Sequence, residues 1–393
     1  MQTKSTFFLF CTMQFRDIVG QKDIKDRLIR TVSDNRVSHA QLFLGPEGSG
    51  NLALAIAYAQ FISCAERLDD DSCGVCSSCR KYTKIIHPDL HFSYPFFRGG
   101  EKEDASPDLE EWRDLVISNP YFNLDKWRER LDAQNKQPNI NKAECMNILH
   151  RLSLKPFESE YKAMIIWLPE YLKNEGNRLL KTLEEPAEKT LIILVAQNQD
   201  QLLNTIISRT QLVKIPALSQ MDIRDHLMKT KDITETKAAQ TAYLCEGNLQ
   251  AALNLLEEDD NDNFRMFSGW MRMTFADKGN LIFEFVDEAS KIGRESQKNL
   301  LRYSINLLRE CILLLSGANV LVHLPAKELD FISNFSRQLD LAKAEALINE
   351  LDKAHYHIER NANPKILFLD VSLQFVKILK FNTLPSGTQY ILD

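Results

Sequence analysis

The stretch that decides the fold class is AQLFLGPEGSGNLALAIAYAQFI, which covers residues 40–62. Residues 40–44 form a short apolar run typical of a buried strand, residues 45–50 form a glycine loop, and residues 52–62 form an alanine-rich helical run. A strand, a glycine loop and a helix in this order can hold phosphate on the backbone N–H groups at the start of the helix. The stretch therefore predicts an α/β domain with a phosphate loop.

Further strands follow with helices between them. Residues 163–168 are apolar and lead into a predicted helix at about 177–185, which stops at Pro186. Residues 191–196 and 212–215 read as two more strands, with a helix near 202–207 between them. Strands that alternate with helices predict a parallel sheet covered on both faces.

The strand signals end at Pro216, and the rest of the chain is predicted to be helical. Amphipathic helices near 222–228, 238–245 and 249–256 predict a helical lid, and helices that include 299–315 and 365–381 predict an all-α domain. We therefore expect an N-terminal extension at 1–14, an α/β domain at 15–216, a lid at 217–256, an acidic linker at 257–263 and a helical domain at 264–393.

Residues 92–137 interrupt the alternation of strands and helices and are predicted to be an insertion. They are rich in proline, glycine, aromatic and charged residues. Two interpretations stay open: the aromatic side chains form a surface for a partner, or the segment is a partly ordered loop that packs on its own core.

Composition and charge exclude some classes of protein. The chain has 393 residues, 44% hydrophobic and 26% charged, with a formal net charge of -6, so it does not match a protein that binds nucleic acid by bulk positive charge alone. No apolar run approaches the roughly 18 residues that span a bilayer. The apolar stretch at 7–11 is too short for a signal peptide, so a cytoplasmic location is expected; Met1 and Met13 are both candidate starts.

The phosphate loop keeps its frame and lacks its working residues. A complete loop has the pattern G-x-x-x-x-G-K-[ST], in which the lysine reaches the phosphates and the hydroxyl holds Mg²⁺. Gly45, Gly48 and Gly50 are present, but Asn51 stands at the lysine position and Leu52 at the hydroxyl position. The glycine spacing alone also fits any tight strand-to-helix turn.

The end of the strand at 163–168 gives an independent check. A nucleotide hydrolase of this architecture needs acidic residues there to hold Mg²⁺ and position water. Only Glu170 is present, and Pro169 replaces its neighbour. Two defects in one site predict a chain that does not hydrolyse ATP.

Four of the eight cysteines lie within sixteen positions, and they are Cys64, Cys73, Cys76 and Cys79. Four clustered thiolates can surround one tetrahedral Zn²⁺, which is the closed coordination of a structural site. The alternative is a set of free or redox-active cysteines. His87 and His91 are not included as ligands, because a structural site needs four.

Together these features resemble the AAA+ clamp-loader family of bacterial DNA polymerase III, and within it the delta-prime members. The matching segments are residues 15–21, 38–45, the four cysteines, 87–89, 152–156, 179–186 and 208–210. The resemblance runs from about residue 15 to 256, and the later helices match only in character. It implies an AAA+ module with a lid and a helical collar that forms a ring with other subunits.

The resemblance also assigns roles to residues. Delta-prime members lose the phosphate loop that the ATP-hydrolysing paralogue keeps, and Gln250 stands where the lid of an ATPase would present an arginine. Ser208 and Arg209 match the element whose arginine projects into a neighbour's ATP site, and a planar, always charged guanidinium suits that role. Thr210 departs from the usual cysteine. An ordinary structural role for Arg209 is the alternative.

The resemblance implies a subunit without ATPase activity of its own, in a DNA-directed DNA polymerase III holoenzyme, which is a nucleotidyltransferase. Its expected partners are the ATPase and delta subunits of the loader, the sliding clamp and primed DNA, and its expected cofactor is structural zinc. Two alternatives are an active AAA+ ATPase with an unusual phosphate loop and a free-standing zinc-dependent DNA-binding protein.

Overall fold

The computed structural model describes residues 13–97, 104–133, 136–257, 260–276, 279–318, 322, 324–360 and 362–381. The N-terminal extension predicted at 1–14 therefore lies outside the described residues except for Met13 and Gln14. The chain divides near Ala252 into two compact units. Among the described helices, none is both long and apolar enough to cross a membrane.

The first unit is built on a five-stranded sheet in which all strand pairs are parallel, in the order β2-β3-β4-β1-β5. The strands are β1 (Ala40–Leu44), β2 (Leu90–Ser93), β3 (Lys162–Trp167), β4 (Thr190–Ala196) and β5 (Gln211–Lys214). In the register of the central pair, Ala40 lies opposite Ile192 and Leu44 opposite Ala196. Because β1 lies between β4 and β5, the loop that follows it lies at the carboxyl edge of the sheet beside the end of the central strand, β4.

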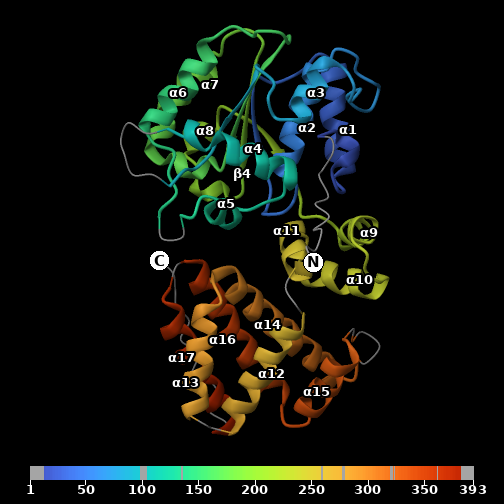
Figure 1. Cartoon of the computed structure of the whole chain (residues 1–393), viewed down its shortest axis with the longest axis vertical. Coiled ribbons are helices and arrows are strands. Elements are labelled where there is room, and N and C mark those ends of the chain that lie inside the picture. Colours follow the sequence, from blue (N-terminus) through green and yellow to red (C-terminus); the bar gives the residue numbers. More distant parts are fainter. Residues whose placement is uncertain are drawn as a thin grey trace, which may run out of the picture. The chain divides into compact units, whose positions relative to one another are not determined.

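Helices cover both faces of this sheet (Figure 1). The helical elements of the first unit are η1 (Phe15–Asp17), α1 (Lys22–Ser33), α2 (Asn51–Ser63), α3 (Ser77–Thr83), η2 (Ser106–Asp108), α4 (Leu109–Ser118), α5 (Leu124–Arg130), α6 (Lys142–Ser153), η3 (Pro169–Leu179), α7 (Leu180–Glu184), η4 (Gln199–Gln201), α8 (Asn204–Ile207), α9 (Gln220–Thr230) and α10 (Glu235–Leu244). The next helix, α11 (Leu249–Glu257), begins in the first unit and crosses the division after Ala252.

The central helix α2 is buried along its whole length, as its alanine-rich, apolar sequence predicts. It packs against β1, β3 and β4, and Tyr58 lies 6.2 Å from the ring of Phe43 between ring centres. Residues of α6, η3, α7 and α8 form a core with the opposite face of the sheet, which includes Leu42, Met164 and Ile192. The predicted parallel α/β domain is confirmed.

The predicted insertion at 92–137 needs a correction, because its first two residues belong to a strand. Leu90–Ser93 form β2, which pairs in parallel with β3 at the edge of the sheet and was not predicted. The strand has only four residues, too few for its alternation to stand out. After it, Phe96 and Asn139 form an isolated antiparallel bridge, so the excursion closes on itself.

The aromatic residues of this excursion are buried and form its core. The buried set is Phe92, Tyr94, Phe96, Phe97, Trp112, Tyr121, Phe122 and Trp127. Trp112 stacks on Tyr94 at 4.1 Å between ring centres and meets the edge of Trp127 at 5.5 Å. Trp127 also donates from Nε1 to the carbonyl of Pro95 at 2.7 Å. These contacts favour the packed interpretation over an aromatic partner surface.

The second unit is helical. Its helices are α12 (Asp260–Ala276), α13 (Gly279–Lys291), α14 (Arg294–Leu315), α15 (Ala326–Ser336), α16 (Leu341–Glu359) and α17 (Pro364–Lys380). Trp270 lies at the centre of the core, stacked on Phe285 at 4.8 Å, and its Nε1 donates to Ser372 Oγ at 2.9 Å. A helical C-terminal part was predicted and is confirmed.

The predicted acidic linker at 257–263 needs a second correction. Glu257 ends α11 and Asp260 begins α12, while 258 and 259 lie outside the described residues. The run of acidic residues suggested a solvated linker, but buried residues at 263, 267, 270 and 271 continue a helical spacing back into it. Spacing of buried positions, and not local charge, decides where this helix begins.

Candidate functional site

The phosphate loop has the backbone of a binding loop. Gly48 and Gly50 have φ values of +71° and +86°, which side-chain-bearing residues rarely adopt. The loop ends at Gly50, where α2 begins. The N–H groups at the start of a helix attract anions, so this frame could hold a phosphate if the space above it were free.

Asn51 turns inward from the position where a phosphate-binding lysine would stand. Its Nδ2 donates to the carbonyl oxygens of Gly45 at 3.2 Å and Ala196 at 3.3 Å, and its Oδ1 accepts from the N–H of Leu52 at 2.9 Å. The side chain is buried. Asn51 therefore joins the loop to β4 and offers nothing to a ligand.

Glu170, the carboxylate that follows β3, is also committed to the backbone. Its Oε1 accepts from the N–H groups of Gln197 at 2.6 Å and Asn198 at 2.8 Å. Burial raises the pKa of this carboxyl group, although the backbone hydrogen bonds oppose that shift. The side chain links the ends of β3 and β4, which is a structural use of the position where a hydrolase holds Mg²⁺.

Side chains of the lid close over the loop. A Cβ atom added at Gly48 would lie 1.9 Å from Asn248 Oδ1, and the N–H of Leu249 donates to the carbonyl of Gly48 at 3.2 Å. Gln250, at the position of the missing arginine, is buried, and its Oε1 accepts from Nδ2 of Asn119 at 2.6 Å. The structure thus brings Gly48, Asn51 and Gln250 to one place but leaves them paired with other protein groups.

Ser208 and Arg209 lie elsewhere, at the end of α8, and are partly exposed. Arg209 Nε donates to Glu184 Oε1 at 2.6 Å, and its Nη1 donates to the carbonyl of Thr205 at 3.0 Å and to Ser208 Oγ at 3.3 Å. The Arg209 side chain is 31% exposed and that of Glu184 49%. Three hydrogen bonds, one at Nε and two at Nη1, fix the direction of the guanidinium while part of the side chain faces solvent.

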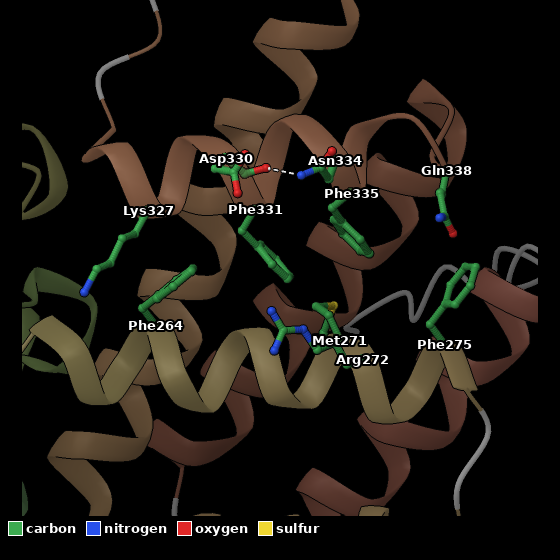
Figure 2. Close-up of a pocket in the computed structure, with 10 residues that line it drawn as sticks. All are labelled: Phe264, Met271, Arg272, Phe275, Lys327, Asp330, Phe331, Asn334, Phe335 and Gln338. Atoms are coloured by element: carbon green, nitrogen blue, oxygen red, sulfur yellow. Dashed lines mark hydrogen bonds between the residues drawn. The ribbon is translucent and has the colours of Figure 1, made fainter.

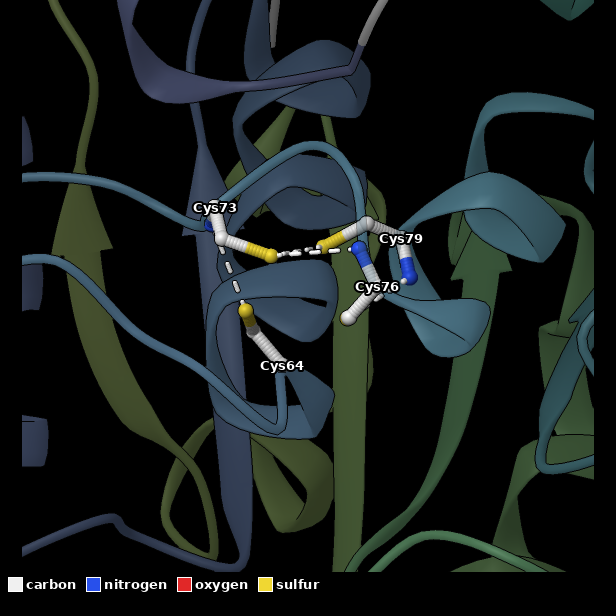
Figure 3. Close-up of side chains that lie close together, drawn as sticks. All are labelled: Cys64, Cys73, Cys76 and Cys79. Atoms are coloured by element: carbon white, nitrogen blue, oxygen red, sulfur yellow. Dashed lines mark hydrogen bonds between the residues drawn. The ribbon is translucent and has the colours of Figure 1, made fainter.

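The four cysteines come together as predicted (Figure 3). Their Sγ atoms all lie within 4.8 Å of one another, and those of Cys73 and Cys79 are 3.9 Å apart. Zinc–sulfur bonds of about 2.3 Å place neighbouring sulfurs of a tetrahedral site roughly 3.8 Å apart. The donor set and its spacing therefore fit one zinc ion. Neither His87 nor His91 joins this cluster.

Backbone N–H groups point at the cysteine sulfurs. The N–H of Cys73 donates to Cys64 Sγ at 3.3 Å, that of Cys76 to Cys73 Sγ at 3.3 Å, and that of Cys79 to Cys76 Sγ at 3.4 Å. Such bonds stabilise thiolates, the form that binds metal. Burial raises the pKa of Cys64 and Cys79. At Cys76 burial also acts to raise the pKa, but hydrogen bonds from the N–H groups of Cys79 and Ala65 and from the thiols of Cys79 and Cys73 together lower it to about 7.

Surface hollows in the described part of the chain include one beside the phosphate loop and one in the second unit. One, of about 410 Å³, lies beside Gly45 at the ends of β1, β4 and β5, and its lining includes Gln197, Asp200 and Lys214. The other, of about 550 Å³, is a groove between α12 and α15 in the second unit (Figure 2). There the guanidinium carbon of Arg272 lies 5.5 Å from the ring centre of Phe331. The ten residues that line this groove, all described, include no cysteine, histidine or serine.

Sequence reasoning missed the contribution of the excursion to the site. Asn119, Tyr121 and Asn123 contact the loop or the lid, although the chain places them about seventy residues after the loop. A local signal was available, because Asn123 and Asn141 each stand before a helix and cap it with their side chains. These capping residues predict that helices begin at 124 and 142, but they do not predict that the turn before α5 lies over the phosphate loop.

Comparison with known proteins identifies the family. The family model described as "DNA polymerase III, delta subunit" matches residues 20–219, about half of the chain. The chain belongs to this family of clamp-loader subunits. The predicted resemblance is confirmed.

Curated relatives include both delta-prime and gamma subunits. The delta-prime subunit of Bacillus subtilis is 27% identical over 241 residues, 61% of this chain and 60% of the relative. The gamma subunit of Buchnera aphidicola is 28% identical over 254 residues, 63% of this chain and 59% of the relative. The matches thus span about 60% of these relatives' length. A gamma subunit-related protein of Thermotoga maritima aligns over 90% of this chain and 99% of its own, at 16% identity and a TM-score of 0.39, too low to carry an argument.

Proposed function

We propose that this chain is a delta-prime-type, non-hydrolysing subunit of the DNA polymerase III clamp loader. In this role it acts in the cytoplasm with the ATPase and delta subunits of the ring, and it supports ATP-dependent loading of the sliding clamp on primed DNA. The observation that carries the proposal is the inward position of Asn51, in a chain that belongs to the family by sequence. A loop whose lysine position bonds its own backbone cannot neutralise a nucleotide's phosphates.

The positive contribution proposed for the chain is Arg209. Glu184 accepts from its Nε and Thr205 from its Nη1, and part of the side chain is exposed. A guanidinium supplied by a neighbouring subunit can stabilise charge on a transferring phosphoryl group. Ser208 supports it through the 3.3 Å contact of its Oγ with Nη1. The chain would then complete the ATP site of a neighbouring subunit while its own phosphate loop hydrolyses no ATP.

Structural zinc is proposed for the four cysteines. The module is tied to the rest of the unit, because Asp71 accepts from the N–H groups of Phe15 at 3.1 Å and Arg16 at 3.0 Å, and Gln60 Nε2 donates to Ser72 Oγ at 3.0 Å. A metal bound by Cys64, Cys73, Cys76 and Cys79 would supply cross-links to this short segment and no catalysis.

Reconstitution tests the proposal. The full chain is mixed with the ATPase and delta subunits and the clamp of the same organism, and the mass of the complex and its ATP turnover are measured. We expect the chain to enter the complex, to show no turnover alone, and to be required for turnover stimulated by clamp and DNA. A chain that hydrolyses ATP alone, or that stays out of the complex, contradicts the proposal.

A further inference from the structure

The turn at residues 119–123 lies on the phosphate loop. It joins α4 to α5, and its Tyr121 contacts both Val19, which follows η1, and Gly50 in the loop. The Tyr121 Oη accepts from the N–H of Val19 at 2.9 Å, and a Cβ atom added at Gly50 would lie 2.8 Å from Tyr121 Cε1. An aromatic edge therefore packs against Gly50, the last glycine of the loop, directly before α2.

Two asparagines of the same turn reach the lid and the loop. Asn119 Nδ2 donates to Gln250 Oε1 at 2.6 Å in the lid. Asn123 Nδ2 donates to Glu47 Oε1 at 3.1 Å, and Nδ2 of Asn248 in the lid donates to the same oxygen at 3.0 Å. The Glu47 carboxylate thus carries negative charge within the loop and receives one donor from the turn and one from the lid.

Aromatic packing on both sides fixes the position of the turn at 119–123. Trp112 in α4 and Trp127 in α5 are fully buried and meet edge to face at 5.5 Å, so the two helices that flank the turn share one core. Phe122, within the turn, packs on Trp112 at 5.3 Å and on Trp167 of β3 at 4.9 Å. The turn therefore does not depend on the lid for its position.

We infer that the turn at 119–123 is an internal occupant of the phosphate site that holds the lid on the loop without nucleotide. Glu47 takes the place of the phosphate charge, and the amides of Asn123 and Asn248 take the place of its donors. Hydrogen bonds to an ionised carboxylate are stronger than neutral ones, so this junction can close the lid by itself. The inference goes beyond the proposed function, because it depends on contacts within this chain and not on Arg209 or a partner.

Hydrogen exchange on the full chain tests the inference. In Asn248→Asp the side chain keeps the oxygen that caps the N–H of Ala251, and in Asn123→Asp it keeps the oxygen that caps Lys126, but each faces Glu47 with a carboxylate. We expect each to raise exchange in α9 to α11 roughly tenfold, with β4 unchanged. The control, Asn363→Asp, keeps its cap on α17 in the second unit and should change neither.

Three outcomes would overturn the inference. The first is wild-type exchange in the lid of both Asn248→Asp and Asn123→Asp. The second is an equal rise in the lid and in β4, which would show that the lid has no opening of its own. The third is protection of residues 45–52 of the wild-type chain by Mg²⁺-ADP, which would show that the site is free to bind nucleotide. Unchanged exchange with Mg²⁺-ADP supports the inference.

Discussion

The side-chain amide of Asn51 donates to the carbonyl oxygen of Gly45 at 3.2 Å, which joins the last part of the phosphate loop to its first residue. The same nitrogen lies 3.3 Å from the carbonyl oxygen of Ala196 in β4. A lysine at this position would extend toward the phosphates, whereas the shorter asparagine cross-links the backbone beneath them. The side chain at position 51 therefore has a structural role, and this role predicts what happens when the motif residues are restored.

Asn51→Lys combined with Leu52→Thr should restore the loop motif without restoring ATPase activity. Glu170 stays bonded to the backbone at 197 and 198, and Gln250 stays bonded to Asn119, so neither Mg²⁺ nor the γ-phosphate gains its remaining partners. Catalytic groups that act as a unit are not rescued singly. Phosphate release from the purified double variant is the measurement, with an ATPase subunit of the loader as positive control.

Turnover by the unmodified chain that survives further purification would contradict this account. A substitution at Gly50 separates the chain's own activity from contamination, since Gly50 has a φ of +86° and tolerates no side chain without strain. Activity abolished by that substitution would belong to this chain.

Cys76→Ser should release the metal and loosen the segment around it. Zinc content should fall from about one per chain to well below one, because a structural site needs all four ligands. Exchange should rise across residues 65–83 before it changes in β1 or β4, which have their own core. Elemental analysis and hydrogen exchange measure both effects.

Cys145→Ser is the matched control, because Cys145 is buried in α6 outside the cluster. It should keep its zinc. A folded wild-type chain without metal, in which all four clustered thiols react with an alkylating agent, would refute the zinc site.

Stability should depend on pH through His91. Burial, with the nearby charges of Arg151 and Lys162, lowers the pKa of His91 from 6.5 to about 4. The folded state therefore favours the neutral ring, so its stabilisation is complete above pH 6.5 and is lost as the pH falls toward 4. Between pH 7 and 5 the free energy of unfolding should fall by about 2 kcal/mol more in the wild type than in His91→Gln.

Urea unfolding followed by tryptophan fluorescence measures this difference, since three of the four tryptophans lie in the first unit. Equal losses of stability in the wild type and in His91→Gln over this pH range would show that the ring does not titrate as inferred.

Glu184→Gln should weaken the orientation of Arg209 and not the fold. The pair is exposed, so the change removes roughly 0.2–1 kcal/mol of interaction, or a factor of about 1.5 to 5 in the turnover of the reconstituted loader. Glu185→Gln removes the same charge from the neighbouring exposed position and is the matched control. A loss of the same size in both variants would indicate a general charge effect.

The sequence predicts the central strands because each is a continuous apolar run buried on both faces, as at 163–167 and 191–196. It does not reveal β2, whose four residues alternate at the edge of the sheet. It also misplaces the start of α12, because the acidic residues there resemble a linker. Length and local charge limit such predictions, since the deciding contacts come from residues far along the chain.

The candidate site, like the fold, has features that local sequence predicts and features that it does not. Among the residues that a motif singles out, the four cysteines form the cluster that their spacing predicts, whereas Asn51 and Gln250 are bonded to other protein groups. Tyr121 and Asn123 belong to no motif, and they reach the loop because the helices on either side of their turn pack together through Trp112 and Trp127. Contacts of this kind depend on tertiary packing, which no local pattern specifies.

Arg209→Ala in the reconstituted loader tests the central claim most directly. An arginine supplied in trans is worth roughly 10³ to 10⁵ in rate at a single site, and the loss in the whole complex should be smaller because several sites act together. We expect normal assembly and zinc content, lower ATP turnover in the presence of clamp and DNA, slower clamp loading, and poor rescue by Arg209→Lys, which lacks the planar fork. Normal assembly with both rates at wild-type values would contradict the account and leave Arg209 a structural partner of Glu184.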